Sequence, residues 1–177
     1  MIIERIKLHI YKYRVIYIAL GILMVIYLNE TSKKHDKIVV FDLDETLGYF
    51  SELSLFCNGI EMFIQRPMHT EEIVHIFDLF PEFFRPYILN CLEYLKEQKL
   101  KNNVQVMIYT NNNGTKKWVN TIKTYLEYKL NYELFDKIIG TYKFKNKVIE
   151  PLRTTFEKTL SDFKRVVNIK GKVDICF

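Results

Sequence analysis

The chain has 177 residues, a hydrophobic fraction of 49% and a charged fraction of 27%, values that fit one globular domain and exclude a disordered chain. The formal net charge of +5 comes without a basic stripe or a recognition motif, so we expect no direct contact with nucleic acid. This mild charge still allows an acidic or phosphorylated partner or an anionic membrane surface.

The N-terminal part contains an uncharged hydrophobic run at residues 15–28, with tyrosines near both ends. The run is shorter than the about 20 residues of a membrane span, but Lys12 and Arg14 can extend it because long basic side chains reach back to the interface. We expect residues 1–36 to be a single-pass membrane anchor and linker. A cleaved signal peptide and a buried helix are the alternatives, and basic residues on both sides leave the topology open.

Residues 37–177 alternate strand-like and helix-like stretches. The strand-like stretches are short hydrophobic runs, at residues 37–41, 104–109, 136–142 and 173–177. The helix-like stretches repeat hydrophobic residues at helical spacing, after Pro86, after residues 113–115 and at residues 155–163. This alternation predicts an α/β domain with a mainly parallel sheet.

The three cysteines, Cys57, Cys91 and Cys176, are widely spaced and form no C-x-x-C pair. An odd and sparse set argues against a disulfide framework and against a cysteine zinc site. We expect each to be a small buried residue. The domain is therefore expected in a reducing compartment, on the cytosolic or nuclear side.

Two acidic residues, Asp42 and Asp44, directly follow the first predicted strand. Ligands of open parallel sheets bind at the carboxyl ends of the strands, and carboxylates at such a position need a partner or a hard divalent cation. One carboxylate can attack phosphorus while the other moves protons. The alternative is a pair of loop acids that cap the following turn.

Two further segments offer groups that can hold a phosphate. Thr110 and Asn111 follow the second predicted strand and open a polar turn before a helix. Lys158 lies within the third predicted helix and could offset the charge of a phosphoryl group. Taken alone, the first pair is equally typical of helix capping, and a helix lysine is usually solvated.

The segment Asp42-Leu43-Asp44-Glu45-Thr46-Leu47 resembles the first motif of the haloacid-dehalogenase superfamily. Its form is similar to that of phosphatases acting on the carboxy-terminal domain of RNA polymerase II, the NLI-interacting-factor-like family. Arg85-Pro86, Tyr109-Thr110-Asn111 and Lys158-Thr159-Leu160-Ser161 are similar to later elements of that family, in the same order. The resemblance covers about residues 37–177 and implies a Rossmannoid three-layer domain.

The resemblance also implies roles for these residues. Asp42 is the implied nucleophile and Mg²⁺ ligand, and Asp44 is the implied general acid and base that gives a backbone carbonyl to the metal. Thr110 and Lys158 are the implied phosphate ligands, with Asn111 beside them in the second motif.

Between the first motif and Arg85, the superfamily places a flap or a cap. Here this segment, residues 48–80, is too short for a separate cap domain, so we expect a small flap and an open site. An open site suits a phosphoprotein or phosphopeptide more than an enclosed metabolite. The resemblance further implies that Thr46 orients the loop of the first motif.

One element of the family is missing. Its fourth motif is a pair of acids after the last core strand, which completes the magnesium site, whereas here the predicted strand at residues 173–177 reaches the last residue. Asp174 lies inside that strand and is a poor substitute. We therefore expect either a C-terminally incomplete domain or a damaged metal site.

These observations predict a magnesium-dependent phosphatase that works through a phospho-aspartate, on phosphoserine or phosphothreonine of proteins. One alternative is a catalytically inactive, membrane-tethered binding domain of the same fold. Another is a phosphatase of small molecules, because the first motif is shared across the superfamily. The sequence does not indicate an oligomeric state.

Overall fold

The structure, a computed structural model, describes residues 13, 16, 18, 20–24, 36–112 and 116–177. The chain divides into two compact units, Met1–His35 and Asp36–Phe177. The described residues of the first unit are helical and exposed. In the part of the chain that the structure describes, no helix has the length and apolar character needed to cross a bilayer. The predicted anchor at residues 15–28 lies partly outside that part.

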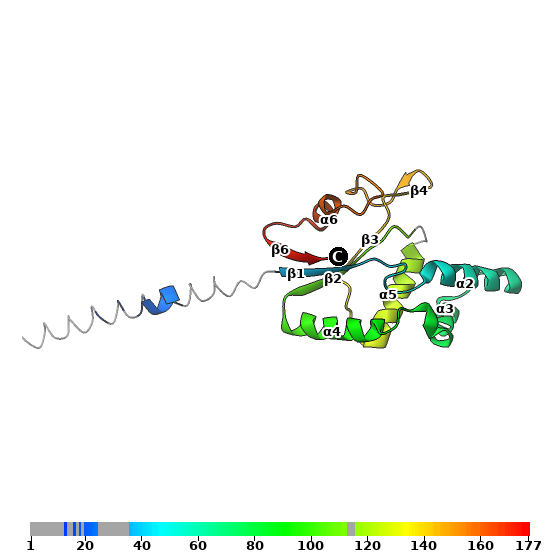
Figure 1. The fold of residues 1–177 in the computed structure, drawn as a ribbon, viewed down its shortest axis with the longest axis horizontal. Helices are drawn as coiled ribbons and strands as arrows, with labels where there is room; N and C mark the ends of the chain where they lie inside the picture. Colours follow the sequence, from blue (N-terminus) through cyan, green and yellow to red (C-terminus); the bar gives the residue numbers. More distant parts are fainter. Residues whose placement is uncertain (1–12, 14–15, 17, 19, 25–35, 113–115) are drawn as a thin grey trace, which may run out of the picture. The chain divides into compact units, whose positions relative to one another are not determined.

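The second unit alternates strands and helices, which confirms the predicted α/β class (Figure 1). Its elements in chain order are β1 (Asp36–Phe41), α2 (Phe50–Ile64), α3 (Thr70–Leu79), the 3-10 helix η1 (Pro81–Phe83), α4 (Ile88–Lys101), β2 (Val104–Tyr109), α5 (Lys116–Leu130), β3 (Lys137–Ile139), β4 (Lys143–Phe144), β5 (Lys147–Val148), α6 (Leu160–Val167) and β6 (Val173–Cys176).

The main sheet has four strands in the order β3-β2-β1-β6, and all neighbouring pairs are parallel. The chain proceeds from β1 to β2 and β3 and then crosses to β6, on the other side of β1. The strand order therefore switches direction beside β1. In open α/β sheets, ligands bind at the carboxyl ends of the strands at such a switch point.

Both faces of the central strands are covered by helices (Figure 1). Val106 and Ile108 of β2 belong to the larger core, which includes residues of α2, α3, α4 and α5. Met107 and Tyr109 alternate with them and pack with Phe163 of α6. Because side chains of a strand alternate between two faces, a three-layer domain needs this doubly hydrophobic pattern.

The helix predicted at residues 155–163 begins later, at Leu160. Thr159 is its N-cap, with an extended backbone and a side-chain oxygen that accepts a hydrogen bond from the Asp162 backbone N–H. The carboxylate of Asp162 also accepts hydrogen bonds from two backbone N–H groups upstream, which holds that segment as a loop. Lys158 therefore lies in a loop, and its predicted place on a helix is wrong.

The third strand is shorter than the predicted residues 136–142 and contains only Lys137–Ile139. Its pairing with β2 ends at Tyr109 and Ile139, where β2 itself ends. The next carbonyl, of Gly140, accepts a hydrogen bond from the buried Arg153 side chain at 2.7 Å.

The predicted burial of the cysteines holds only for Cys57. Burial, with the nearby Glu61 carboxylate, raises the pKa of the Cys57 thiol to about 11, so this thiol is unreactive at neutral pH. Cys91 and Cys176 are exposed. Cys91 precedes Leu92, which faces the core from α4, and one residue of an α-helix turns the side chain by about 100°.

The insertion at residues 48–80 consists of helices α2 and α3, a small addition to the sheet domain. It begins at Gly48, whose backbone pairs with that of Phe84. A Cβ atom at Gly48 would lie 2.6 Å from the Phe83 carbonyl oxygen and 2.7 Å from Cζ of Phe50. Only glycine allows this close approach of the insertion to the core.

We expect Gly48→Ala to lower the free energy of unfolding by about 1–3 kcal/mol, because the added methyl group must displace a carbonyl oxygen and a packed ring. Urea denaturation measures this change. Gly59→Ala is the matched control, since Gly59 lies within α2 with no atom within 4 Å of its added Cβ, and alanine there should add about 0.5–1 kcal/mol. Equal stability of Gly48→Ala and wild type would contradict the close approach.

Candidate active site

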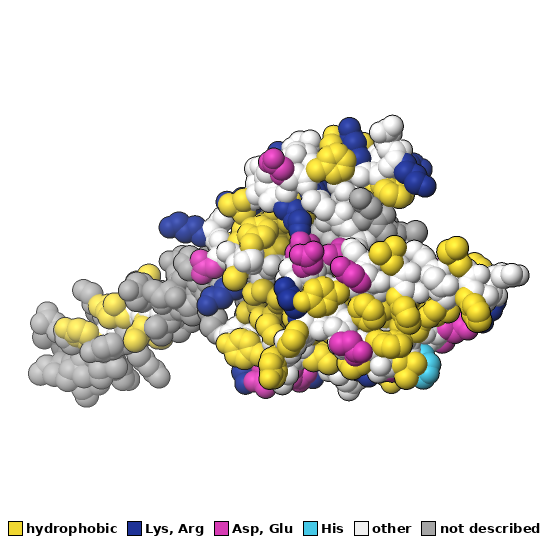
Figure 2. Space-filling model, turned by 45° about the vertical axis from the view of Figure 1, so that its right-hand side comes forward, with side chains coloured by type: hydrophobic (Ala, Val, Ile, Leu, Met, Phe, Trp, Pro, Cys, Tyr) yellow, Lys and Arg dark blue, Asp and Glu magenta, His cyan; other side chains and the backbone are white. Residues whose placement is uncertain are grey.

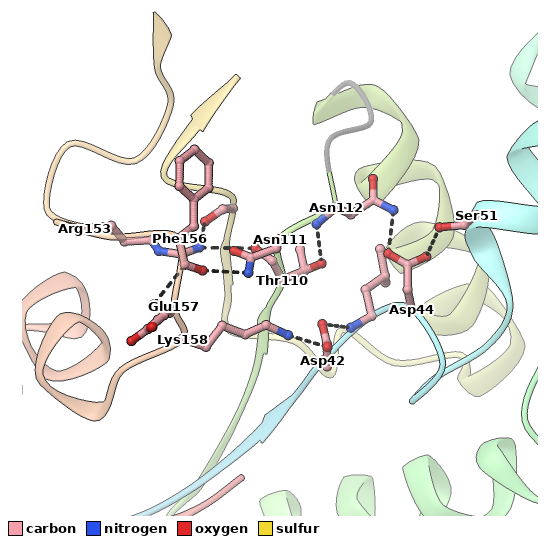
Figure 3. A network of polar contacts seen from close by, with 12 residues as sticks. Asp42, Asp44, Ser51, Thr110, Asn111, Asn112, Arg153, Phe156, Glu157 and Lys158 are labelled. Atoms are coloured by element: carbon pink, nitrogen blue, oxygen red, sulfur yellow. Dashed lines mark hydrogen bonds and ion pairs between the residues drawn. The ribbon is translucent and has the colours of Figure 1, made fainter. Parts of the chain in front are cut away.

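The loop after β1 directs two acidic side chains towards one cleft (Figure 3). Leu43 and Leu47 of this loop are fully buried, and the Leu47 N–H donates a hydrogen bond to the Leu43 carbonyl at 3.0 Å. With the leucines fixed in the core, Asp42 and Asp44 line the cleft. In this loop the leucine side chains therefore point into the core, and the aspartate side chains point into the cleft.

The side chain of Arg85 stabilises the same loop through two hydrogen bonds. Its Nε donates to the Glu45 carbonyl and its Nη1 donates to the Tyr49 hydroxyl, both at 2.8 Å. Glu45 has a positive φ of 59°, a conformation that needs such support. Thr46 is exposed in this turn and does not line the cleft, so its orienting role stays a prediction.

Lys158 reaches Asp42, the predicted nucleophile, from the loop before α6. Its Nζ forms an ion pair with Oδ2 of Asp42, while Oδ1 of Asp42 accepts a hydrogen bond from the Leu43 N–H at 2.8 Å. Both charged side chains are partly exposed, at 27% for Lys158 and 38% for Asp42. A phosphoryl group that meets Asp42 would therefore meet the ammonium group as well.

Asp44 is held between two elements (Figure 3). Its Oδ2 accepts a hydrogen bond from the Asn112 side chain at 2.7 Å, and its Oδ1 accepts one from the Ser51 hydroxyl at 3.3 Å. These contacts fix the orientation of the carboxylate between the loop after β2 and the start of α2. A general acid and base needs such fixed geometry.

Thr110 presents a hydroxyl group at the carboxyl end of β2. The residue is buried, with 1% of its surface exposed, and its Oγ1 accepts a hydrogen bond from the Asn112 backbone N–H at 2.9 Å. The hydroxyl proton can therefore be donated to a phosphate oxygen. Asn111 instead uses its side-chain N–H to hold the Phe156 carbonyl at 2.7 Å, so it ties the cleft wall to the loop of Lys158.

These groups share one open cleft with a volume of about 630 Å³. It is lined by the predicted residues Asp42, Asp44, Thr110, Asn111 and Lys158, and by Ser51, Ser54, Leu55, Asn112 and Trp118. The structure thus brings together five of the predicted site residues from three separate segments of the chain. The α2 residues form one wall, which is the contribution of the predicted flap.

A buried arginine, Arg153, holds the wall that carries Lys158. Only 1% of Arg153 is exposed. Its guanidinium donates hydrogen bonds to the carbonyl groups of Gly140 at 2.7 Å, Phe156 at 3.0 Å, Thr110 at 3.4 Å and Glu157 at 3.4 Å. One side chain therefore connects the ends of β2 and β3 with the loop just before Lys158.

The aromatic ring of Tyr109 supports the same guanidinium. The Arg153 Cζ lies 4.7 Å from the ring centroid, a distance typical of a cation–π contact. The planar charge is thus held between a ring and several carbonyl groups. These contacts offset part of the cost of burying an arginine, although its Nε has no hydrogen-bond partner among the described residues.

The carboxylates fit a magnesium ion only together with a substrate. Among residues 36–112 and 116–177, no group of three or more acidic, histidine or cysteine side chains is placed to hold a metal. Magnesium often takes one or two carboxylates and completes its shell with water and phosphate oxygens. The Asp42 carboxylate, with the backbone carbonyl of Asp44, suits that mode, while Asp174 is exposed on β6 and does not line the cleft.

Comparisons with protein-family models, with curated proteins and with solved structures find no match. The family resemblance of the motifs therefore stays a prediction, and the functional argument rests on the geometry of the cleft. A fold of this class hosts many activities, so the site must carry the argument.

Three residues that build the site were not predicted as site residues: Ser51, Asn112 and Arg153. Asn112 directly follows the predicted Thr110 and Asn111, so its position was a usable signal. Ser51 and Arg153 stand in segments without a motif. Ser51 contacts Asp44, seven residues before it, and Arg153 contacts both nearby carbonyl groups and the distant carbonyl of Thr110. Nothing in the local pattern distinguishes them from surface residues.

We expect Arg153→Lys to lower the free energy of unfolding by about 2–3 kcal/mol, because one ammonium group cannot serve the same carbonyl groups and leaves buried acceptors unpaired. Thermal or urea denaturation measures this. Lys170→Gln, at an exposed position, is the control and should change the free energy of unfolding by less than about 0.5 kcal/mol. If Arg153→Lys were as stable as wild type, the hydrogen bonds of the Arg153 guanidinium would not contribute to the stability of the fold.

The buried carboxylate of Asp162 generates a prediction about pH. The Thr154 backbone N–H, the Thr154 hydroxyl and the Arg165 guanidinium hold the pKa of Asp162 below its ordinary value. A group with a depressed folded-state pKa stabilises the fold above its unfolded pKa of about 4, and this stabilisation is lost as pH falls through the folded value.

Asp162→Asn should therefore melt below wild type at pH 7, with the difference shrinking below about pH 4. Thermal unfolding at pH 7, 5 and 3 tests this. The exposed Asp174→Asn is the control and should change little at any pH. A difference that stays constant with pH would remove Asp162 as the cause.

Proposed function

We propose that this chain is a phosphatase that forms a phospho-aspartate on Asp42 and acts on phosphoserine or phosphothreonine of proteins. The observation that carries the proposal is the ion pair between Asp42 and Lys158 at the switch point of the sheet, with Asp44 oriented beside it. A nucleophile, a proton carrier and a phosphate ligand thus share one cleft. The motif order that resembles the NLI-interacting-factor-like family, and with it a haloacid-dehalogenase-like fold, agrees with this proposal.

In the first step, a carboxylate oxygen of Asp42 attacks the phosphorus atom, and the bond from phosphorus to the serine or threonine oxygen breaks. Asp44, protonated at this stage, gives its proton to that leaving oxygen. In the second step, the Asp44 carboxylate takes a proton from a water molecule, whose oxygen attacks the phosphorus. The bond to Asp42 breaks, phosphate leaves and both aspartates return to their initial states.

The remaining cleft groups position the phosphoryl group. The Lys158 ammonium and the Thr110 hydroxyl are donors for its oxygens, and their fixed positions stabilise negative charge as it develops. The Asp42 carboxylate and the Asp44 backbone carbonyl would hold Mg²⁺, which supplies further charge neutralisation when bound. Asn112 and Ser51 keep the Asp44 carboxylate aligned.

The shape of the cleft favours a phosphorylated protein over a small metabolite. The insertion contributes only α2 and α3, and Ser54 and Leu55 of α2 form one wall of an open cleft. A phosphorylated side chain on a peptide can enter such a cleft without a cap closing over it. Membrane attachment through residues 15–28 stays a prediction beside this proposal.

A second function fits one observation. The Lys158 ammonium forms an ion pair with the Asp42 carboxylate. Among the described residues, the cleft has two carboxylates and no third that could bind a metal ion. A domain that recognises phosphorylated segments without hydrolysing them could use the same Lys158 and Thr110. The following experiment separates the two functions.

Asp42→Asn should lower kcat/KM for p-nitrophenyl phosphate and for a phosphoserine peptide by about a thousandfold or more, because no phospho-aspartate can form. Steady-state kinetics in magnesium buffer measure this. Glu45→Gln, in the same loop but outside the cleft lining, is the matched control and should stay within about twofold. Phosphopeptide binding without turnover in wild type would favour the recognition function, and full activity of Asp42→Asn would overturn the nucleophile assignment.

A further inference from the structure

The hairpin formed by β4 and β5 concentrates positive charge. Lys143, Lys145 and Lys147 lie within five consecutive residues, on or between its two strands. The two residues that join the strands, Lys145 and Asn146, both have positive φ angles, of 46° and 62°. This is the geometry of a tight type I′ turn, so the hairpin presents its lysines on a fixed scaffold.

No described residue neutralises these lysines. None of the three forms an ion pair in the described part of the chain. The Lys143 Nζ lies 4.7 Å from the Tyr142 ring centroid, and the Lys145 Nζ lies 5.4 Å from that of Phe144. Glu150, which follows the hairpin, makes no ion pair with them either. The hairpin therefore keeps an excess of positive charge.

The turn residue Lys145 is an unfavourable choice for its backbone conformation. The left-handed region favours glycine or asparagine, because a Cβ atom comes close to the following carbonyl oxygen. The neighbouring position holds asparagine, which suits the turn. A cation placed where the backbone favours glycine points to a use for the charge.

The hairpin is continuous with the cleft. A second cavity of about 330 Å³ is lined by Gly140, Thr141 and Phe144 and shares Thr110 and Asn112 with the cleft. Figure 2 shows basic and hydrophobic side chains side by side at the upper edge of the molecule, where Figure 1 places β4. A chain bound in the cleft can thus extend over the second cavity to the lysines.

The hairpin is also fixed to the loop that carries Lys158. The Tyr142 and Phe156 rings pack edge to face, with centroids 5.6 Å apart, and the Phe156 carbonyl is held by Asn111 and Arg153. The hairpin and the loop of Lys158 are therefore parts of one connected structure.

We propose that the β4–β5 hairpin binds an acidic or phosphorylated residue of a peptide whose reacting phosphoryl group lies in the cleft. The inference rests on the proposed function and adds a substrate class to it: phosphoproteins with anionic residues beside the phosphorylated one. We favour a peptide over a membrane surface because the second cavity, lined in part by Phe144, joins the hairpin to the cleft through Thr110 and Asn112. Phe144 and Val148 of the hairpin are exposed, so the test below includes lipid vesicles.

Paired phosphoserine peptides test the proposal, one member with glutamates and the other with glutamines, scanned through successive positions on either side of the phosphoserine. Wild type should show kcat/KM about tenfold higher for the glutamate peptide at the best position. The triple variant K143Q/K145Q/K147Q should bring this ratio close to one. The triple variant K101Q/K170Q/K172Q, with the same charge change at exposed positions elsewhere, should keep the wild-type ratio.

Lys145→Gly keeps the test valid should the triple variant misfold. Glycine relieves the positive φ of 46°, so its melting temperature should equal or exceed that of wild type. Its peptide ratio should nevertheless fall by about twofold, since one of three charges is lost. A wild-type ratio in well-folded Lys145→Gly and in the triple variant would overturn the proposal.

Fluorescence anisotropy with the labelled glutamate and glutamine phosphopeptides separates this inference from the proposed function. No hydrolysis of any substrate, with glutamate-dependent binding that the hairpin substitutions abolish, would sink the phosphatase and retain the subsite. Brisk hydrolysis with equal kcat/KM for both peptides would sink the subsite and retain the phosphatase. Lysine-dependent binding to vesicles containing phosphatidylserine, without a peptide preference, would also overturn the subsite, in favour of a lipid surface.

Discussion

The buried guanidinium of Arg153 is the interaction on which the functional part of the structure depends. It binds carbonyl groups from the ends of β2 and β3 and from the loop before Lys158, and residues 149–159 of that loop form no helix or strand. No backbone hydrogen bonds of a helix or sheet hold this loop in place. The Arg153 guanidinium, which has several N–H donors in one plane, holds it instead, and Lys158 therefore lies beside Asp42.

The cleft combines two kinds of support for its acids. Asp42 faces a cation that can move onto a substrate phosphate, whereas Asp44 is held by the neutral side chains of Asn112 and Ser51. The two carboxylates therefore have different environments although they stand two residues apart. Different environments assign different chemical roles to similar groups; in the proposed mechanism these roles are attack on phosphorus and proton transfer.

Several predictions failed because side-chain contacts decided the outcome. Thr159 and Asp162 accept hydrogen bonds from backbone N–H groups at and before the start of α6, and Arg153 binds the Gly140 carbonyl just after β3. Cys91 is exposed because the adjacent Leu92 faces the core. Hydrophobic periodicity detects which segments can be helices or strands. It does not detect where the buried side chains of Arg153 and Asp162 form hydrogen bonds with backbone groups next to those helices and strands.

The sequence by itself determined the α/β class, β2 at Val104–Tyr109, the start of α4 and the two acids after β1, because each depends on local periodicity or on the residues that follow a strand. The tertiary structure decided that Lys158 meets Asp42, that Asn112 and Ser51 hold Asp44, and that Arg153 builds the wall between them. The contacts of Lys158 with Asp42 and of Asn112 with Asp44 join segments of the chain that lie far apart, whereas Ser51 is seven residues from Asp44. Parallel strands bring such segments to one edge, and only packing selects which side chains meet there.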